Sequence, residues 1–88
     1  DGYIRGVEII NIIERYRSKV AVTVITDLDP SGQEYNATTP YDPDAVAAEK
    51  LINLEGRFYM EMDRDNTTGE VTAITITELD KHNLLPEP

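Results

Sequence analysis

The hydrophobic residues between Gly6 and Arg17 recur with the period of an α-helix. Polar residues such as Glu8 and Asn11 fall on the opposite side of this segment. Glu8 can accept a hydrogen bond from the backbone of Arg5, as half of a capping box, although Arg5 has no side-chain oxygen of the kind a good N-cap supplies. The spacing i, i+3, i+4, i+7 predicts a helix over residues 6–17 whose buried stripe is Ile9, Ile12, Ile13 and Tyr16.

The next segment alternates between apolar and polar positions and predicts a β-hairpin. Residues 20–26 form the first strand, with Val20, Val22 and Val24 on one face. The stretch "DLDPSG" has the composition of a hairpin loop, so Asp27, Asp29 and Gly32 are interpreted as loop residues. The return strand is expected over residues 33–38.

Two more strands follow a second, shorter helix in this interpretation. "YDPDAVAAEKLIN" has Asp42 as N-cap and Pro43 in the first helical position, which predicts a helix ending near Asn53. "RFYMEMD" and "EVTAITIT" alternate with the period of strands, and residues 63–71 join them as a turn. One face of these strands is formed by Phe58, Met60, Met62, Thr72, Ile74 and Ile76.

Together these elements predict the α+β class. We expect a small antiparallel sheet of about four strands, with the N-terminal helix packed on one face and a second short helix. Residues 1–79 form a single domain in this interpretation, and the polar, proline-terminated residues 80–88 form a disordered tail.

Composition narrows the functional classes. The chain has 88 residues with 17 acidic and 8 basic side chains, a formal net charge of −9. This charge repels phosphate backbones and anionic lipid headgroups, so neither nucleic-acid binding nor direct membrane binding is expected. Mimicry of nucleic acid is also disfavoured, because the carboxylates are scattered along the chain. The absence of cysteine excludes disulfides, cysteine-based zinc sites and thiol nucleophiles, and it is compatible with an extracytoplasmic bacterial protein.

The stretch "DRDNTTGEV", residues 63–71, is the strongest candidate for a metal site. An EF-hand-type loop needs ligands at positions 1, 3 and 5, glycine at 6 and glutamate at 12. Asp63, Asp65 and Thr67 match the first three, but Gly69 falls at position 7 and Ile74 at position 12. A hairpin turn in which Gly69 adopts a positive φ explains the pattern better. We therefore assign no metal ligand.

Other candidate groups are also better explained by structure. His82 is the only histidine and lies in the expected tail, so no histidine-based triad or metal site can be assembled. Asp42 and Asp44 are adjacent to proline and are expected to cap or turn the chain. The following tyrosines form either a binding platform or ordinary packing, which we favour: Tyr3, Tyr35, Tyr41 and Tyr59. No catalytic or cofactor-binding residue is predicted, no cofactor is implied, and the protein is not expected to be an enzyme.

The segments "DGYIRGVEIINIIERYRSKVAVTVIT" and "LINLEGRFYMEMDRDN" resemble a family of small uncharacterised proteins from Gram-positive, clostridia-like bacteria. Arg5 replaces the small hydroxyl residue typical of the family. The resemblance implies an N-terminal membrane span followed by an extracytoplasmic domain, and an association with pilus-like or secretion-type assemblies. It spans most of residues 1–78 and is carried by Asp1, Gly2, Ile4, Gly6, Glu8, Ile9, Ile10, Ile52, Asn53, Gly56, Phe58, Arg64, Asp65 and Asn66.

Two functional hypotheses follow. The first is a non-catalytic extracytoplasmic module, tethered to the membrane by a segment outside this sequence, that works by contacts with an unidentified protein partner and takes part in a surface assembly. The alternative is a free-standing acidic inhibitor or binding protein, for example of phage origin, directed at a basic partner.

Overall fold

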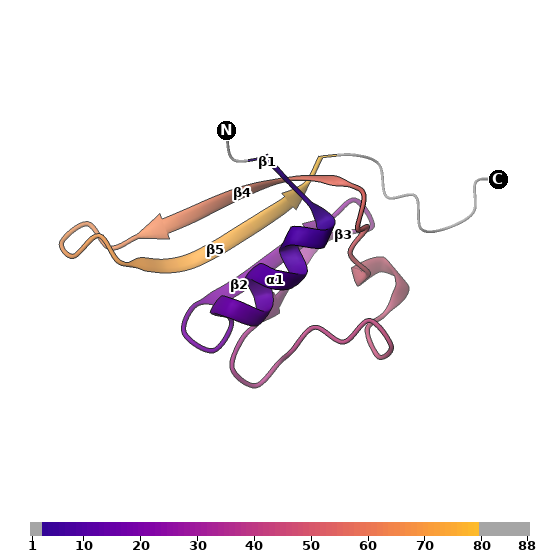
Figure 1. Ribbon diagram of the computed structural model, residues 1–88, viewed down its shortest axis with the longest axis horizontal. Helices are drawn as coiled ribbons and strands as arrows, with labels where there is room; N and C mark the ends of the chain where they lie inside the picture. Colours follow the sequence, from indigo (N-terminus) through magenta and orange to yellow (C-terminus); the bar gives the residue numbers. More distant parts are fainter. Residues whose placement is uncertain (1–2, 80–88) are drawn as a thin grey trace.

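The computed structural model describes residues 3–79, which form one five-stranded sheet with a single α-helix across one face (Figure 1). The predicted tail over residues 80–88, including His82, lies outside the described residues. The elements in chain order are β1 (Tyr3–Arg5), α1 (Gly6–Tyr16), β2 (Ala21–Thr26), β3 (Asp29–Tyr35), a single 3-10 turn η1 (Ala48–Lys50), β4 (Arg57–Arg64) and β5 (Val71–Glu78).

The strand order is β1-β4-β5-β2-β3, and the sheet is mixed. β2 and β5 run parallel at its centre, whereas the other three pairs are antiparallel. The α+β class is confirmed, but the expected sheet of about four antiparallel strands is corrected on two points. The three-residue β1 is too short to show a period in the sequence. The parallel pair arises because α1 carries the chain across the sheet before β2 begins.

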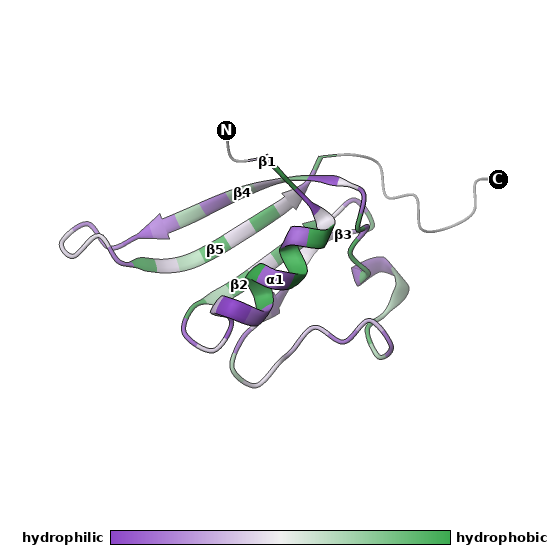
Figure 2. Cartoon of the chain, viewed as in Figure 1, coloured by the Kyte–Doolittle hydropathy of each residue, from purple (hydrophilic) through white to green (hydrophobic). Residues whose placement is uncertain are grey.

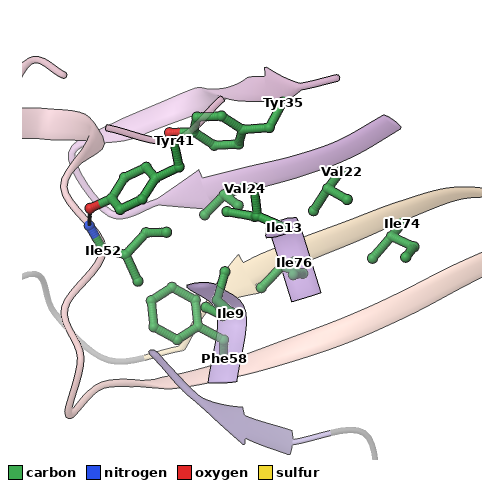
Figure 3. Close-up of a cluster of buried hydrophobic side chains, with 10 residues drawn as sticks. All are labelled: Ile9, Ile13, Val22, Val24, Tyr35, Tyr41, Ile52, Phe58, Ile74 and Ile76. Atoms are coloured by element: carbon green, nitrogen blue, oxygen red, sulfur yellow. Dashed lines mark hydrogen bonds between the residues drawn. The ribbon is translucent and has the colours of Figure 1, made fainter. Parts of the chain in front are cut away.

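The core lies between α1 and the sheet, as the stripe on residues 6–17 predicts. Ile9 and Ile13 of α1 are fully buried, while Ile12 and Tyr16 are half-buried at its margin. Hydrophobic residues alternate with polar ones along β2, β4 and β5 (Figure 2), and alternate residues of these strands are buried in the core. Figure 3 shows the buried cluster, which consists of Ile9, Ile13, Val22, Val24, Tyr35, Tyr41, Ile52, Phe58, Ile74 and Ile76.

The first hairpin is tighter than the sequence predicts. β3 begins at Asp29, so only Asp27 and Leu28 join it to β2. Asp29 is not a loop residue but a buried strand residue, and its carboxylate forms an ion pair with Lys50 at 2.8 Å. Gly32 also lies within β3, where a φ of +83° accompanies the irregular register opposite Val24 and Thr26.

The expected helix from Asp42 to about Asn53 is reduced to η1. Asp42 does start a turn, because its carboxylate accepts the N–H of Asp44 at 3.0 Å. Beyond that turn, tertiary hydrogen bonds use backbone groups that a helix would need. The N–H of Ile52 donates to the Tyr41 hydroxyl at 3.0 Å (Figure 3), and the Glu49 carbonyl accepts the Thr26 hydroxyl at 2.7 Å.

The start of α1 is held by a neighbouring loop. The N–H of Arg5 donates to Glu8 Oε2 at 2.8 Å, as the half capping box predicts. The N–H of Gly6 donates to the Gly56 carbonyl at 3.0 Å, and the next N–H donates to the same loop. These carbonyls satisfy the free N–H groups at the helix start in place of an N-cap side chain.

Candidate protein-interaction surface

The turn predicted within residues 63–71 is formed by residues 65–70, whereas Asp63 and Arg64 belong to β4 and Val71 to β5. Asp65 Oδ1 accepts the N–H groups of Thr67 and Thr68 at 2.7 and 2.8 Å, and these hydrogen bonds hold the pKa of its carboxyl below the usual range. Gly69 has a φ of +78°, which confirms the conformation predicted for it. Ile74, at the position where a calcium loop needs glutamate, is buried in the core.

The four tyrosines do not form one platform. Tyr35 and Tyr41 make an edge-to-face pair inside the core, with ring centroids 5.5 Å apart. Tyr3 and Tyr59 make a second edge-to-face pair, at 5.9 Å, and both are exposed. The packing interpretation is confirmed for the first pair, whereas the second lies on the sheet face turned away from α1.

Tyr35 carries a buried hydroxyl that has no hydrogen-bond partner. Burial raises its pKa to about 12, with smaller contributions from Tyr41 and Asp29. A phenol with this pKa stays protonated near neutral pH and does not serve as a general base. Within residues 3–79, no three histidine or carboxylate side chains gather closely enough to hold a metal ion. Among residues 3–79, no helix combines the length and the hydrophobicity that a membrane span requires.

The feature that sequence reasoning missed is an uncovered strand edge. β1 pairs only with Arg57, Phe58 and Tyr59 of β4. The remainder of β4, residues 60–64, has a strand neighbour on the β5 side alone within the described chain. We call this stretch the open edge. The sequence could not reveal it, because it depends on how far the unrecognised β1 extends along β4.

Hydrogen bonds show which backbone groups point out of the open edge. The N–H of Leu79 donates to the Arg57 carbonyl across the β5 side, and the N–H of Gly6 donates to the Gly56 carbonyl on the opposite side. Backbone polar groups alternate sides along a strand, so odd-numbered residues of β4 face β5. The N–H and C=O groups of Met60 and Met62 therefore point outward, toward the open edge.

A groove of about 300 Å³ runs between α1 and the open edge. Its apolar surface is formed by Ile4, Ile12, Tyr16, Met60 and Met62. Its polar rim consists of side chains from α1, namely Glu8, Asn11 and Arg15.

A second hollow lies beside the loop that precedes β4. It is more apolar than the groove and is bounded by residues such as Ile10, Leu51 and Leu54. Its lining within residues 3–79 contains no strand residue, and its one charged side chain is that of Glu55. At about 490 Å³ this hollow is larger than the groove, but the groove is the one that adjoins the β4 edge.

Comparison with protein-family models, curated proteins and solved structures found no match to this chain.

Proposed function

We propose that this domain is a non-catalytic protein-interaction module that binds an extended segment of a partner protein along the open edge of β4. The main support is that β1, described from Tyr3, pairs with β4 as far as Tyr59, and within residues 3–79 no strand lies beside Met62 on that side. An uncovered strand edge is a template for another chain.

The groove beside the strand edge would contribute specificity, which backbone hydrogen bonds alone do not provide. When a strand adds to a sheet, main-chain hydrogen bonds contribute affinity and pockets for alternate side chains contribute specificity. A strand beside Met60 and Met62 would direct every second side chain toward the groove under α1, where Ile12 and Tyr16 offer apolar contact. Edge and groove are thus two parts of one binding site.

The location belongs to the proposal as well. We place the module outside the cytoplasm and tethered to a membrane, as part of a surface or secretion-type assembly, on the basis of the family resemblance of residues 1–78. Fusion of a reporter enzyme that is active only outside the cytoplasm to the full-length gene product would test this placement independently of binding.

The binding proposal can be tested by selecting peptides from a random library on the immobilised domain. Met62→Pro is the decisive variant, because it removes an outward N–H without touching the hydrogen bonds between β4 and β5. Met62→Thr is the matched control, since it keeps the N–H and also shortens the side chain. We expect selected peptides to bind the wild type and Met62→Thr, but not Met62→Pro, and to shift the amide resonances of residues 60–64.

Circular dichroism and thermal unfolding should first show that Met62→Pro retains the fold. Peptides that bind Met62→Pro as well as the wild type, or that shift resonances elsewhere, would contradict strand addition. A library that yields no binding peptide would contradict it too.

A further inference from the structure

We infer that the outer face of the sheet, the face turned away from α1, binds an amphipathic helix of a partner protein that carries basic residues along both flanks. This surface is formed by the central strands β2 and β5 and by the side chains of their two neighbours. It is distinct from the edge of β4 and from the groove under α1.

The parallel pair of β2 and β5 at the centre of the sheet has a helix on one face only. Parallel strands are found mainly where helices cover both faces of a sheet. α1 lies across the inner face (Figure 1), and the buried side chain of Asp29 holds η1 on the same side through Lys50. Residues 3–79 contain no further helix. A helix of a partner protein would therefore give β2 and β5 the second covered face that parallel strands usually have.

The outer face of this pair presents small and β-branched side chains without a charge. Its residues lie opposite one another in three pairs, namely Ala21 and Ala73, Thr23 and Thr75, and Ile25 and Thr77. We call these six residues the floor. All six side chains are half-buried by their neighbours in the sheet. The floor thus offers an uncharged surface, of the kind against which the apolar side of a helix packs.

Carboxylates border the floor on both sides. Glu61 of β4 lies opposite Thr75, and Glu34 of β3 lies opposite Thr23. Because Thr23 and Thr75 are themselves opposite each other, one row across four strands has a carboxylate at each end and two threonines between them. We call the carboxylates at the two ends of this row the rims.

The rims retain their negative charge. Asp63 extends the β4 rim by one further outward residue, and all three carboxylates are exposed. Glu34 accepts a hydrogen bond from the neutral Asn36 amide at 2.9 Å. The salt bridge found within residues 3–79 joins Lys50 and Asp29, so no ion pair there neutralises a rim.

The distance between the rims matches the width of one helix. Neighbouring strands lie about 4.8 Å apart, so three strand spacings separate Glu61 from Glu34 by about 14 Å. An α-helix with its side chains is about 10–12 Å across. A helix lying along β2 and β5 would therefore have one rim on each side. Lysine or arginine on its flanks would meet the carboxylates, while its apolar residues would face the floor.

A second copy of this chain fits the outer face less well. Two outer faces packed together would bring acidic rims close to each other, in a chain whose formal net charge is −9. Like charges brought together across an interface disfavour association. The one α-helix of the described chain, α1, already packs its apolar stripe against the inner face of its own sheet. The occupant is therefore expected to be a different, basic protein.

The probe is a stapled helical peptide of about 16 residues, because shorter isolated helices are marginal in water. Alanine and isoleucine form one face, lysine occupies both flanks, and the staple lies on the remaining face. One control peptide has glutamate in place of lysine, and another has the same residues in an order that mixes lysine into the apolar face. Each is titrated at low salt into the domain with ¹³C-labelled alanine, isoleucine and threonine methyl groups. We expect the probe to bind at least about tenfold more tightly than either control, with intermolecular NOEs to the methyl groups of Ala73 and Thr75.

A variant in the floor tests the location. Thr75→Lys places a positive charge between the rims and should weaken binding of the probe at least about tenfold. Val7→Lys adds the same charge on α1, at a side chain that is 54% exposed, and is the matched control. It should leave binding within about twofold. Thermal unfolding should first show that both variants retain the fold.

Variants of the rims test the charge. Glu34→Gln with Glu61→Gln should weaken binding about fivefold and reduce its salt dependence, because exposed charge pairs contribute modestly. Glu14→Gln with Asp44→Asn removes the same charge at exposed positions outside the floor and its rims. This control should leave binding within about twofold.

Three outcomes would overturn the inference. If the peptide of mixed order binds as tightly as the probe, or if Thr75→Lys binds as the wild type does, the attraction is diffuse. NOEs between the floor and residues 80–88 in the free protein would identify that segment as the occupant instead. A dimer at neutral pH that Thr75→Lys abolishes would identify a second copy. None of these results bears on strand addition, because selection of peptides against Met62→Pro tests a different surface.

Discussion

The buried hydroxyl of Tyr35 shows how one atom can lower the stability of a small core. Burying a hydroxyl without a hydrogen bond costs free energy, whereas the ring contributes apolar burial. We expect Tyr35→Phe to leave the free energy of unfolding unchanged or raise it by up to about 1 kcal/mol. Tyr35→Ala should lower it by about 3–5 kcal/mol. Urea denaturation measures both, and a large loss in Tyr35→Phe would show that the hydroxyl has a partner.

The raised pKa of Tyr35 predicts an alkaline effect of definite sign. Its folded pKa of about 12 lies above the ordinary value of 10.0, so folding disfavours the ionised phenol. The stabilisation linked to this group is complete below pH 10.0 and is lost as the pH rises toward the folded pKa. Tyr35→Phe should therefore unfold at a higher pH than the wild type, as followed by circular dichroism. Equal alkaline midpoints would contradict the burial of an ionisable group at this position.

The lowered pKa of Asp29 predicts that the protein loses stability at acid pH. A hydrogen bond from Lys50 is the main reason that the pKa of Asp29 lies below its ordinary 3.8. Its contribution to stability is present above pH 3.8 and is lost as the pH falls through the lower folded pKa. The wild type should lose stability more steeply below pH 3.8 than Asp29→Asn does. Asp44→Asn, at an exposed position, is the control and should follow the wild type.

At the scale of elements, the glycine at the start of α1 ties the helix to the loop before β4. A Cβ on Gly6 would overlap the backbone oxygen of Asn53, so alanine there forces the two segments apart. We expect Gly6→Ala to lower the free energy of unfolding by about 3 kcal/mol. Measurement by chemical denaturation should compare it with Gly69→Ala, whose Cβ meets open space.

The turn between β4 and β5 makes a separate prediction. Gly69 has room for a side chain but a positive φ, so Gly69→Ala should cost about 1 kcal/mol through backbone strain alone. Asp63→Asn should leave the melting temperature nearly unchanged, with or without millimolar calcium. A calcium-dependent rise of several degrees that Asp63→Asn or Asp65→Asn abolishes would instead establish a metal site.

Local patterns account for the elements that were predicted correctly. The helix over residues 6–17 and the last two strands follow from side-chain periods that are complete within one segment. Two of the residues quoted for the family resemblance, Gly6 and Gly56, meet through a backbone hydrogen bond. The sequence of one segment does not reveal which distant group will form a hydrogen bond with each of its backbone N–H and C=O groups. Ile52 donates to Tyr41, for example, and so its segment does not continue as a helix.

The candidate site also depends on contacts between segments that are distant in the sequence. Met60 and Met62 were correctly placed on the inner face from their alternation. Their outward backbone groups were not foreseen, because an edge exists only once the order of the strands is known. The sequence therefore placed Ile12, Tyr16, Met60 and Met62 on the inner faces of their elements, but it predicted neither the groove between them nor the strand edge beside it.

At the scale of the whole molecule, α1 covers only part of the sheet. The described chain is elongated, measuring 50 × 29 × 21 Å, and the turn end of the β4–β5 hairpin projects beyond α1 and β2 (Figure 1). Side chains from Glu61 to Glu70 are all exposed. The open edge thus lies where the compact body gives way to a projecting hairpin. Binding segments are commonly found in such regions of lower local stability.

This arrangement predicts two levels of protection from hydrogen exchange within one strand. The amides of Tyr59 and Asp63 both face β5, opposite Thr77 and Ala73, but Tyr59 is also flanked by β1. We expect the Asp63 amide to exchange through local opening and the Tyr59 amide only through global unfolding. Ile13→Ala removes a fully buried side chain and should lower the global free energy of unfolding by about 2–5 kcal/mol. It should therefore accelerate exchange at Tyr59 by about the corresponding factor and leave Asp63 nearly unchanged. Equal acceleration at both amides would mean that the projecting hairpin and the core open as a single unit.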